Sequence, residues 1–408
     1  MMNVEKIRKD FKMLENTMQG HDLIYFDNAA TSLKPKSVVD AVVNYYEHLG
    51  VNCHRGDYDL SFQVDSAYEN ARKGVAEFIG AEEKEIVFTS GTSASLNQIA
   101  YGYGKFLNQG DVILSCEAEH ASSVLPWMKV AEEKGCGIQY VPLDDEGRIT
   151  LENFKKVFND QVKVVALAHV TNVLGYEIPV KEICELAHEK GAVCVIDMAQ
   201  SAPHMKVNVK DLDCDFAAFS SHKMIGPTGV GVLYGKYDLL QKMEPFMLGG
   251  GSNARFDMCG NILLKDAPYK YETGTPPIEG VLGFHAAIQY LSEIGMENIH
   301  AYEKELHDYA IEKLSKLDNL ILYNPHADTG IITFNVKDVF AQDAASYFNT
   351  QGIALRAGQH CAKLLIDKLK TSATLRASLY FYNTKEEIDT FVEACKNATI
   401  ENCLNVFF

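Results

Sequence analysis

The sequence predicts an α/β fold in which a large domain with a mainly parallel sheet precedes a smaller α+β domain. Short apolar runs alternate with helical patterns from about residue 23 to residue 234, which is typical of strands and helices in alternation. After about Asp257 the pattern changes to long helices with a few strands between them. A chain of 408 residues also has the length of two or three domains.

Seven apolar runs of strand length lie in the first region, so we expect a seven-stranded sheet. Helical patterns such as residues 180–191 separate the runs, and strands joined in this way pair in parallel with both faces of the sheet covered. Ligands of such sheets bind beyond the carboxyl ends of the strands. The seven runs are EIVFTS, DVILSC, IQYVPL, VKVVALAHV, AVCVID, DFAAFSS and GVGVLYG.

The later region and the N-terminus complete the expected organisation. Residues 1–18 predict an amphipathic charged helix, and the glycines at 249–251 mark a loop between the halves. The expected later elements are helices over 278–294 and 296–317, strands over 320–323, 330–336 and 375–382, a short helix near Ala341 and a final helix from Thr384. The expected division is an N-terminal helix in 1–21 that packs with the small domain, a large domain over 22–262 and a small domain over 263–408.

Composition excludes several classes of function. Lys and Arg number 38 against 55 Asp and Glu, a net charge of −17, and no basic run is present, so nucleic acid is not an expected partner. The sequence has no signal-peptide pattern and no apolar stretch of membrane-spanning length, which predicts a cytoplasmic protein without a membrane partner. The ten cysteines form no C-x-x-C pair, so we expect reduced thiols, mostly in the core, and no metal site.

The common nucleotide and zinc motifs are absent. Neither Gly-Lys pair, Gly104-Lys105 or Gly235-Lys236, belongs to a phosphate-binding P-loop. No glycine cluster extends to the dinucleotide pattern G-x-G-x-x-G, and H-E-x-x-H does not occur. A cofactor held by side chains at the strand ends is the remaining way to run demanding chemistry on a parallel sheet.

Three groups of residues at predicted strand ends fit such a cofactor. Asp197 ends a buried strand, where its charge requires a cationic partner such as a protonated pyridine nitrogen. Lys223, at the mouth of the next strand, has the chemistry to form a Schiff base. In TSGTSASLN a strand turns into a helix at Thr92 or Ser93, and the free N–H groups of a helix start form a phosphate site. His120 follows another strand at the same edge.

At these motifs the sequence resembles the class V, fold-type I pyridoxal-phosphate enzymes, and within them the group II (SUF-type) cysteine desulfurases. The resemblance runs over nearly the whole chain and implies the fold-type I architecture, pyridoxal 5′-phosphate as cofactor and L-cysteine as substrate. The motifs that carry it are YFDNAATSLKP, NCHRGDY, SGTSASLN, EAEHASSVLPW, HVTNVLG, VIDMAQS, FSSHKMIGPTGVG, YETGTPP, RAGQHCA and LRASLYFYNT.

The resemblance also implies a role for each site residue. Lys223 carries the cofactor, Asp197 pairs with the pyridinium nitrogen, and Gln200 bonds the ring hydroxyl. His120 stacks on the ring and handles protons, a task that suits a near-neutral pKa. The phosphate is held by Thr92, Ser93, Ser220, His222 and, from the neighbouring subunit of a homodimer, Thr275.

Substrate binding and sulfur transfer fall to the later motifs. Asn172, which also contacts the cofactor, Arg376 and Arg356 would bind the substrate. The Arg376 guanidinium would bind the carboxylate through two parallel hydrogen bonds unless an internal acid takes that place. Cys361 is the expected nucleophile that becomes a persulfide, with Arg356 and His360 favouring its thiolate. His54 and Arg55 are either a functional pair or a solvated loop, and Cys53 is expected to pack in the core.

The implied activity converts L-cysteine to L-alanine and passes sulfur to a SufE-like or SufU-like carrier for iron–sulfur cluster assembly. Three alternatives stay open at this point. A selenocysteine lyase would use nearly the same residues on L-selenocysteine, and a class V aminotransferase would not need Cys361. A non-enzymatic scaffold in sulfur trafficking is disfavoured because Lys223, Asp197, Gln200, His222 and Cys361 are all present.

Overall fold

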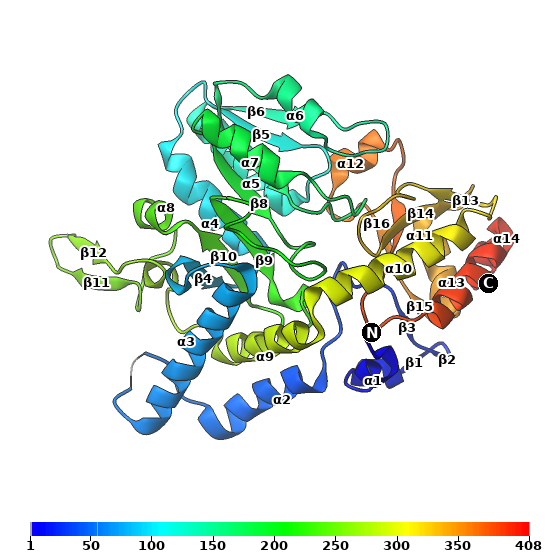
Figure 1. Cartoon of the computed structure of the whole chain (residues 1–408), viewed down its shortest axis with the longest axis horizontal. Helices are drawn as coiled ribbons and strands as arrows, with labels where there is room; N and C mark the ends of the chain where they lie inside the picture. The colour runs from blue at the N-terminus through cyan, green and yellow to red at the C-terminus, as the bar shows by residue number, and fades with distance from the viewer. Residues whose placement is uncertain (1, 55, 408) are drawn as a thin grey trace.

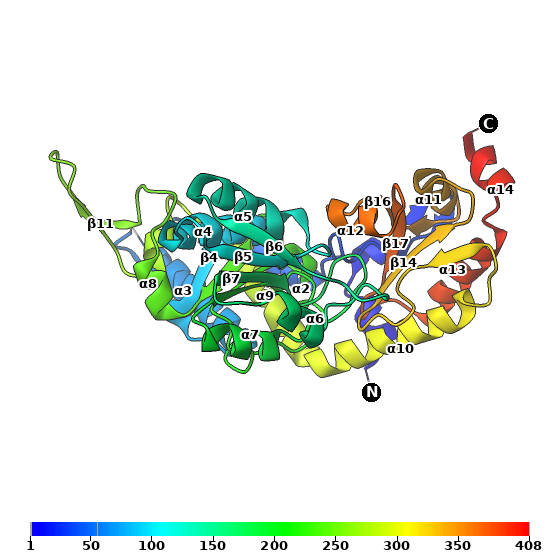
Figure 2. The ribbon, with the colours of Figure 1, turned by 90° about the horizontal axis from the view of Figure 1, so that it is seen from above.

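Two bodies of secondary structure lie side by side in the computed structural model, which describes residues 2–54 and 56–407 (Figure 1). Helices α9 (Ile278–Ile294) and α10 (Met296–Leu314) follow each other with one residue between them. Figure 2 shows that α10 runs from the first body to the second along one side of the molecule. The first body contains a seven-stranded sheet and the second a four-stranded one.

The seven-stranded sheet confirms the predicted mainly parallel architecture. Its order is β4-β10-β9-β8-β7-β5-β6, and only β10 runs antiparallel to its neighbours. The connection from β9 to β10 is short and contains no crossover helix, and a parallel pair would require one. Six strands lie within their predicted runs, and β6 begins one residue before its run IQYVPL. The strands are β4 (Ile86–Thr89), β5 (Val112–Cys116), β6 (Gly137–Val141), β7 (Val162–Ala168), β8 (Val193–Asp197), β9 (Phe216–Ser220) and β10 (Gly231–Gly235).

Helices cover both faces of this sheet because alternate side chains of each strand enter different cores. In β8, Val193 and Val195 pack with α4 (Thr92–Tyr103) and α5 (Ala121–Lys134), whereas Cys194 and Ile196 pack on the opposite face. The helices of that opposite face are α3 (Asp59–Ile79), α7 (Val180–Glu189) and α9. The remaining helices of this body are α2 (Lys36–Asn44), α6 (Leu151–Val157) and α8 (Tyr237–Lys242).

The second body is an antiparallel sheet with helices packed against it, as the pattern after Asp257 predicts. Its order is β13-β14-β17-β16, built from β13 (Leu320–Leu322), β14 (Ile331–Val336), β16 (Arg356–Gly358) and β17 (Thr374–Ser378). Its core takes residues from α10, α11 (Ala341–Thr350) and α13 (Lys385–Asn397). Two short helices complete it, α12 (Lys363–Lys368) and α14 (Ile400–Leu404), so α13 is not the final helix.

The N-terminal segment departs from the prediction of a helix over 1–18. Helix α1 (Val4–Arg8) is only five residues long. The chain leaves the helix because Phe11 is fully buried against the rings of Tyr290, Phe381 and Tyr382. The short strands β1 (Thr17–Met18) and β2 (His21–Asp22) follow, and β3 (Ile24–Tyr25) then pairs in parallel with β15 (Ile353–Ala354) of the second body.

Two further features bear on the expected domains and partners. Helix α9 lies after the expected boundary at residue 262 but packs against α2 and α3, and the three-part division itself stays a prediction. The hairpin of β11 (Asn253–Phe256) and β12 (Ile262–Leu264) projects away from the rest of the chain (Figure 2). Within the described residues, no helix has both the length and the apolar character required to cross a membrane.

Replacing Gly231 by Ala should destabilise the sheet edge at the start of α4. The added Cβ would lie 2.4 Å from the Cα of Gly91, and a backbone atom has no rotamer by which to move aside. Overpacking of this kind costs about 1–3 kcal/mol, measurable as a lower midpoint of urea unfolding. Gly137→Ala is the matched control because its Cβ would meet Val112 at an ordinary 3.4 Å. Equal midpoints for the two variants would contradict the prediction.

Candidate active site

A cavity of about 220 Å³ lies at the carboxyl ends of the parallel strands. Asp197 ends β8, Ser220 ends β9, and the other strands lead directly into the turns that carry Thr92, His120 and Asn172. Strand ends of a parallel sheet meet at one edge, which is why residues so far apart in sequence converge. Twelve residues to which the resemblance assigns a role line the cavity: Thr92, Ser93, His120, Asn172, Asp197, Gln200, Ser220, His222, Lys223, Arg356, Cys361 and Arg376.

Lys223 and Asp197 form the charged base of the cavity. Burial lowers the pKa of Lys223 to about 8, although the Asp197 carboxylate acts in the opposite direction. Asp197 is 6% exposed and accepts a hydrogen bond of 2.9 Å from the backbone N–H of Ala199. Burial raises the pKa of Asp197, and the Ala199 N–H and Lys223 limit that rise. The lysine is therefore readily deprotonated, while Asp197 has a cation to balance its charge.

The start of α4 forms an anion-binding cup. Thr92 donates from its backbone N–H to Ser220 Oγ at 2.7 Å, and the two hydroxyl oxygens lie 2.6 Å apart. The Ser93 hydroxyl lies 2.7 Å from that of Ser122 on α5. These hydroxyls stand at the positive end of the helix, where free N–H groups favour a phosphate.

His120 is the N-cap of α5, and its ring is held as a neutral imidazole. Its Nδ1 accepts a hydrogen bond of 3.1 Å from the N–H of Ser122, so Nε2 is the nitrogen that carries the proton. Burial, Lys223 and Arg376 lower the pKa of His120 to about 4. The expectation of a near-neutral pKa is therefore wrong, because the ring is buried and lies among cations.

His222 shares this behaviour while its backbone anchors the lysine segment. Burial and Lys223 lower the pKa of His222 to about 4. Its carbonyl oxygen accepts hydrogen bonds from Thr31 Oγ1 at 3.0 Å, from the N–H of Ser32 at 3.0 Å and from Lys34 Nζ at 3.0 Å. The residue directly before Lys223 is therefore fixed by a segment from near the N-terminus.

Arg376 lies at the side of the cavity that the second body provides. It is 3% exposed, its Nη1 donates to the carbonyl of Asn172 at 2.8 Å, and its Nη2 lies 3.7 Å from Asp27 Oδ1. Burial lowers the pKa of Arg376 to about 10, and Asp27 limits this effect. Its Nε is buried without a hydrogen-bond partner among the described residues, which leaves a donor for a carboxylate.

Asp27 is a site residue that the sequence reasoning did not single out. Its carboxylate lies between Arg376 and Arg356, which is 4.0 Å away, and burial raises its pKa. The sequence held a signal for it, since a buried arginine on β17 requires an anion and Asp27 ends an apolar segment. Asp27 is the internal acid that the sequence analysis considered for Arg376.

Cys361 lies on the short segment between β16 and α12, with its side chain exposed. His360 and Cys361 both have positive φ, 51° and 56°, a conformation that costs a non-glycine residue about 1–3 kcal/mol. Burial and Arg376 lower the pKa of His360 to about 3. The expectation that His360 favours the thiolate through its charge is therefore wrong, because this ring is neutral.

Asn172 joins this segment to the arginine. Its Nδ2 donates to the carbonyl of His360 at 2.8 Å, while Arg376 binds its backbone carbonyl. Its Oδ1 is buried without a partner in the described part of the chain. The side chain therefore offers an acceptor to the cavity and uses its donor to position the cysteine segment.

Several predicted residues lie elsewhere. Thr275 is exposed and outside the cavity, with its hydroxyl 3.4 Å from Asn52 Nδ2. His54 also lies outside the cavity, with its ring 3.5 Å from a carboxylate oxygen of Glu69. Arg55 falls outside the described residues. Cys53 is 2% exposed and packs in the core, as expected.

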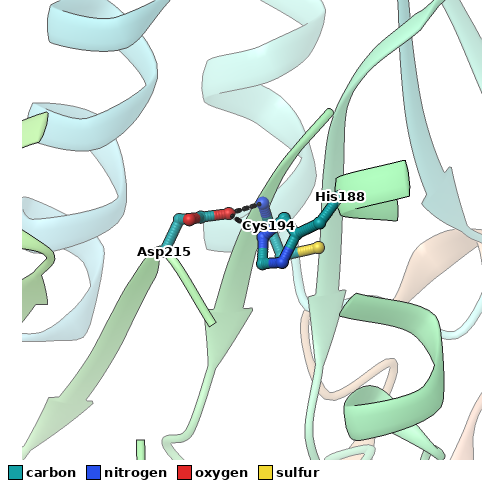
Figure 3. Close-up of side chains that lie close together, drawn as sticks. All are labelled: His188, Cys194 and Asp215. Carbon is teal, nitrogen blue, oxygen red and sulfur yellow. Dashed lines mark hydrogen bonds and ion pairs between the residues drawn. The ribbon is translucent and has the colours of Figure 1, made fainter. Parts of the chain in front are cut away.

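A second cluster, at the opposite end of β8, consists of His188, Cys194 and Asp215 (Figure 3). Their potential metal ligands lie within 4.8 Å of one another. Asp215 Oδ2 already accepts from the N–H of Cys194 at 2.8 Å and lies 2.7 Å from His188 Nε2, while Lys236 Nζ is 3.0 Å from Oδ1. This ammonium neutralises the carboxylate and raises the cost of adding a metal cation, so the cluster is accounted for as an ion-pair network.

Residues 24–391 match the family described as Aminotransferase class-V. The chain belongs to the class-V aminotransferase family. It is 45% identical over 396 residues to a probable cysteine desulfurase of Halalkalibacterium halodurans, a match that covers 96% of this chain and 97% of that protein. It is 44% identical over 410 residues to a cysteine desulfurase of Haloferax volcanii, with 96% of each covered. The solved apo structure of the cysteine desulfurase from Thermococcus onnurineus superposes with a TM-score of 0.93 at 40% identity, over 97% of this chain and 98% of that one.

These matches confirm the fold-type I class V architecture and the resemblance to cysteine desulfurases that the motifs predicted. Pyridoxal 5′-phosphate is the cofactor of the class-V family, and the cavity fits it. Gln200 Oε1 is buried without a partner among the described residues, ready to accept from a ring hydroxyl. Asp197, Lys223 and the cup at α4 supply the carboxylate, the amine and the hydrogen-bond donors that a pyridinium nitrogen, an aldehyde and a phosphate respectively require.

In the cofactor-free protein, the rate at which pyridoxal phosphate bonds to Lys223 should rise with pH and level off near 8. The neutral amine is the nucleophile, and burial lowers the pKa of Lys223 to about 8, so more of it is neutral as pH rises to that value. Stopped-flow absorbance from about pH 6 to about pH 10 measures the rate, with a free lysine derivative of pKa about 10.4 as control. A protein rate that follows the control up to pH 10 would refute the assignment.

Proposed function

We propose that the protein is a cysteine desulfurase that converts L-cysteine to L-alanine and leaves the sulfur on Cys361 as a persulfide. The observation that carries this proposal is that Cys361 and Lys223 line one cavity, together with Asp197 and Arg376. The proposal is further supported by relatives of that name at 44–45% identity over nearly the whole chain.

The base of the cavity activates the substrate. When bound, pyridoxal phosphate withdraws electrons from the substrate Cα and so weakens the bonds around it. Asp197 would hold the protonated ring nitrogen, Gln200 would bind the ring hydroxyl, and Thr92, Ser93, Ser220 and His222 would hold the phosphate. Lys223 would hold the cofactor at its aldehyde, and the free Lys223 amine would move the proton at the substrate Cα, a role that fits a pKa of about 8.

The substrate carboxylate is bound by Arg376, whose Nε has no hydrogen-bond partner in the described ranges 2–54 and 56–407, with the exposed Arg356 beside it. Asp27 holds both guanidinium groups in place near the cavity. Asn172 positions the arginine through its carbonyl and faces the ligands with its Oδ1. The amino acid is thereby oriented with its side chain free to point toward Cys361.

Sulfur transfer then follows without an outside oxidant. The Cys361 thiolate attacks the substrate sulfur, an S–S bond forms and the Cβ–S bond breaks. The bonding electron pair passes to the carbon fragment, which gains a proton at Cβ and leaves as alanine. His120, with Nδ1 occupied by the N–H of Ser122, offers its protonated Nε2 to the substrate sulfur or to the ring oxygen.

The partners of this activity follow from the same features. The exposed persulfide on Cys361 is open to a SufE-like or SufU-like carrier that feeds iron–sulfur cluster assembly in the cytoplasm. The exposed side chains of Phe256, Ile262 and Leu263 on the β11–β12 hairpin fit burial against a second copy. In such a homodimer Thr275, which lies outside the cavity of its own chain, reaches the phosphate of the partner.

Replacing Cys361 by Ser should abolish persulfide formation, with sulfide release from L-cysteine falling on the order of 1,000-fold or more. The visible absorbance of the bound cofactor should remain, because Lys223 is intact. Mass spectrometry after brief exposure to L-cysteine should find one extra sulfur atom on the wild-type peptide that contains Cys361. Cys259→Ser, which removes the other exposed thiol, is the matched control and should behave as wild type.

The outcomes of this experiment separate the candidate functions. Full turnover of Cys361→Ser with a keto acid would identify an aminotransferase, and a protein that never becomes coloured would be a scaffold. Wild-type turnover of L-selenocysteine far above that of L-cysteine would identify a selenocysteine lyase. Each of these results would overturn the proposal.

Arg376→Met should raise the KM for L-cysteine by on the order of 100-fold, because hydrogen bonds to a charged group are worth about 1.5–3 kcal/mol. The KM of Arg376→Lys should fall between those of the wild type and Arg376→Met, since an ammonium keeps the charge but not the planar arrangement of donors. Steady-state kinetics measure the KM, and the cofactor absorbance checks that the cavity is intact. An unchanged KM in Arg376→Met would place the carboxylate elsewhere.

A further inference from the structure

The backbone around Cys361 is tied to two elements of the first body. The carbonyl of Cys361 accepts a hydrogen bond of 2.7 Å from the N–H of Ala121, the first residue of α5. The carbonyl of His360 accepts one of 2.8 Å from Asn172 Nδ2. The segment is thus fixed on both carbonyls, although it belongs to the second body.

The His360 ring ties the same segment to the neighbouring strand. It is 6% exposed, and its Nε2 lies 3.1 Å from the carbonyl oxygen and 3.0 Å from Oγ1 of Thr374 on β17. A carbonyl oxygen only accepts, so Nε2 carries the proton of the neutral ring. The Nε2 proton is donated to Thr374, and Nδ1 carries no proton.

His360 and Cys361 are also consecutive residues with positive φ, 51° and 56°. Side chains with a Cβ adopt this conformation rarely, and it persists only where surrounding contacts determine it. The buried ring on Thr374 and the two carbonyl bonds are such contacts. Without the ring, only the two carbonyl bonds would oppose relaxation of the segment toward ordinary backbone angles.

We propose that His360 is a positioning residue: its ring, bonded to Thr374, locks the left-handed backbone of residues 360 and 361 and so fixes the Cys361 thiol at the cavity. The lock acts through shape and hydrogen bonding, not through charge or proton transfer. This inference rests on the proposed function for the role of Cys361.

The test compares His360→Gln with His360→Phe in the holoenzyme. A glutamine amide retains a donor near the position of Nε2, whereas phenylalanine keeps a ring without a donor. The Phe variant should form persulfide with kcat lower by on the order of 100-fold at unchanged KM and cofactor absorbance, because small displacements of a reacting group have this effect. The Gln variant should remain within about threefold of wild type. Gln359→Ala, an exposed neighbour, is the matched control.

Two further measurements separate positioning from other roles. Exchange of the Cα proton of L-alanine with deuterated solvent uses Lys223 but not Cys361, so it should be unchanged in the Phe variant. Amide hydrogen exchange should become faster in that variant for residues 360–363 and for Ala121, whose N–H binds Cys361, and should stay slow in the Gln variant. Should the Phe variant not fold, His360→Leu removes the donor with less bulk.

The results that would overturn the lock are specific. Equal losses in the Gln and Phe variants, or a shifted pH midpoint of Cys361 alkylation in the Gln variant, would show that the imidazole acts through its proton or charge. Unchanged amide exchange in the Phe variant would show that no lock exists. Amide hydrogen exchange is measured without turnover. Absence of a persulfide on the wild-type protein would therefore refute the proposed function, while amide exchange would still decide whether His360 locks the segment.

Discussion

The charge balance of one buried cavity is the constraint on which the rest of the site depends. Among the described residues, Lys223, Arg376 and Arg356 are balanced by the carboxylates of Asp197, which lines the cavity, and Asp27, which lies beside the two arginines, so cations are in excess. Burial and these cations keep His120, His222 and His360 neutral, because a further positive charge would be neither solvated nor paired. The net positive field that remains suits two anions, a phosphate at the start of α4 and an amino-acid carboxylate at Arg376.

The cavity is held together by chain segments that are distant in sequence. The N–H of Ala29 donates to Ser378 Oγ on β17 at 2.8 Å, while Thr31 and Ser32, two and three residues later, bind the carbonyl of His222. Residues 27–32 therefore bridge the strand that carries Arg376 and the turn that carries Lys223. A displacement between the two bodies would break the hydrogen bonds of Arg376 and of the cysteine segment to the first body, and those of residues 27–32 on either side, so these bonds oppose it. This explains why so polar a site keeps a defined geometry.

The sheet was predictable from the sequence because each strand is an apolar run whose two faces are both buried, and the convergence of strand ends follows from parallel topology. The end of the opening helix was not predictable from the sequence, because burial of Phe11 in an aromatic cluster overrides the local helical periodicity. Protonation states were also beyond the sequence. His120 and His360 occur in motifs that suggest proton chemistry, but their pKa values depend on burial and on cations from other segments. The role of Asp27 could be recognised only once its partner Arg376 on β17 was known to lie beside it.

Under the proposed function the Cys361 thiol receives and releases a sulfur atom, so it cannot be fixed by bonds to its own sulfur, because any such bond would have to break in each cycle. The exposed thiol of Cys361 is free, and the contacts that hold its segment run through two carbonyls and the ring of the preceding residue. This explains the strained backbone: the positive φ angles of His360 and Cys361 turn the chain sharply and expose the Cys361 side chain between β16 and α12. Accuracy is supplied by the neighbours of the nucleophile, and the sulfur itself stays available to substrate on one side and to an acceptor on the other.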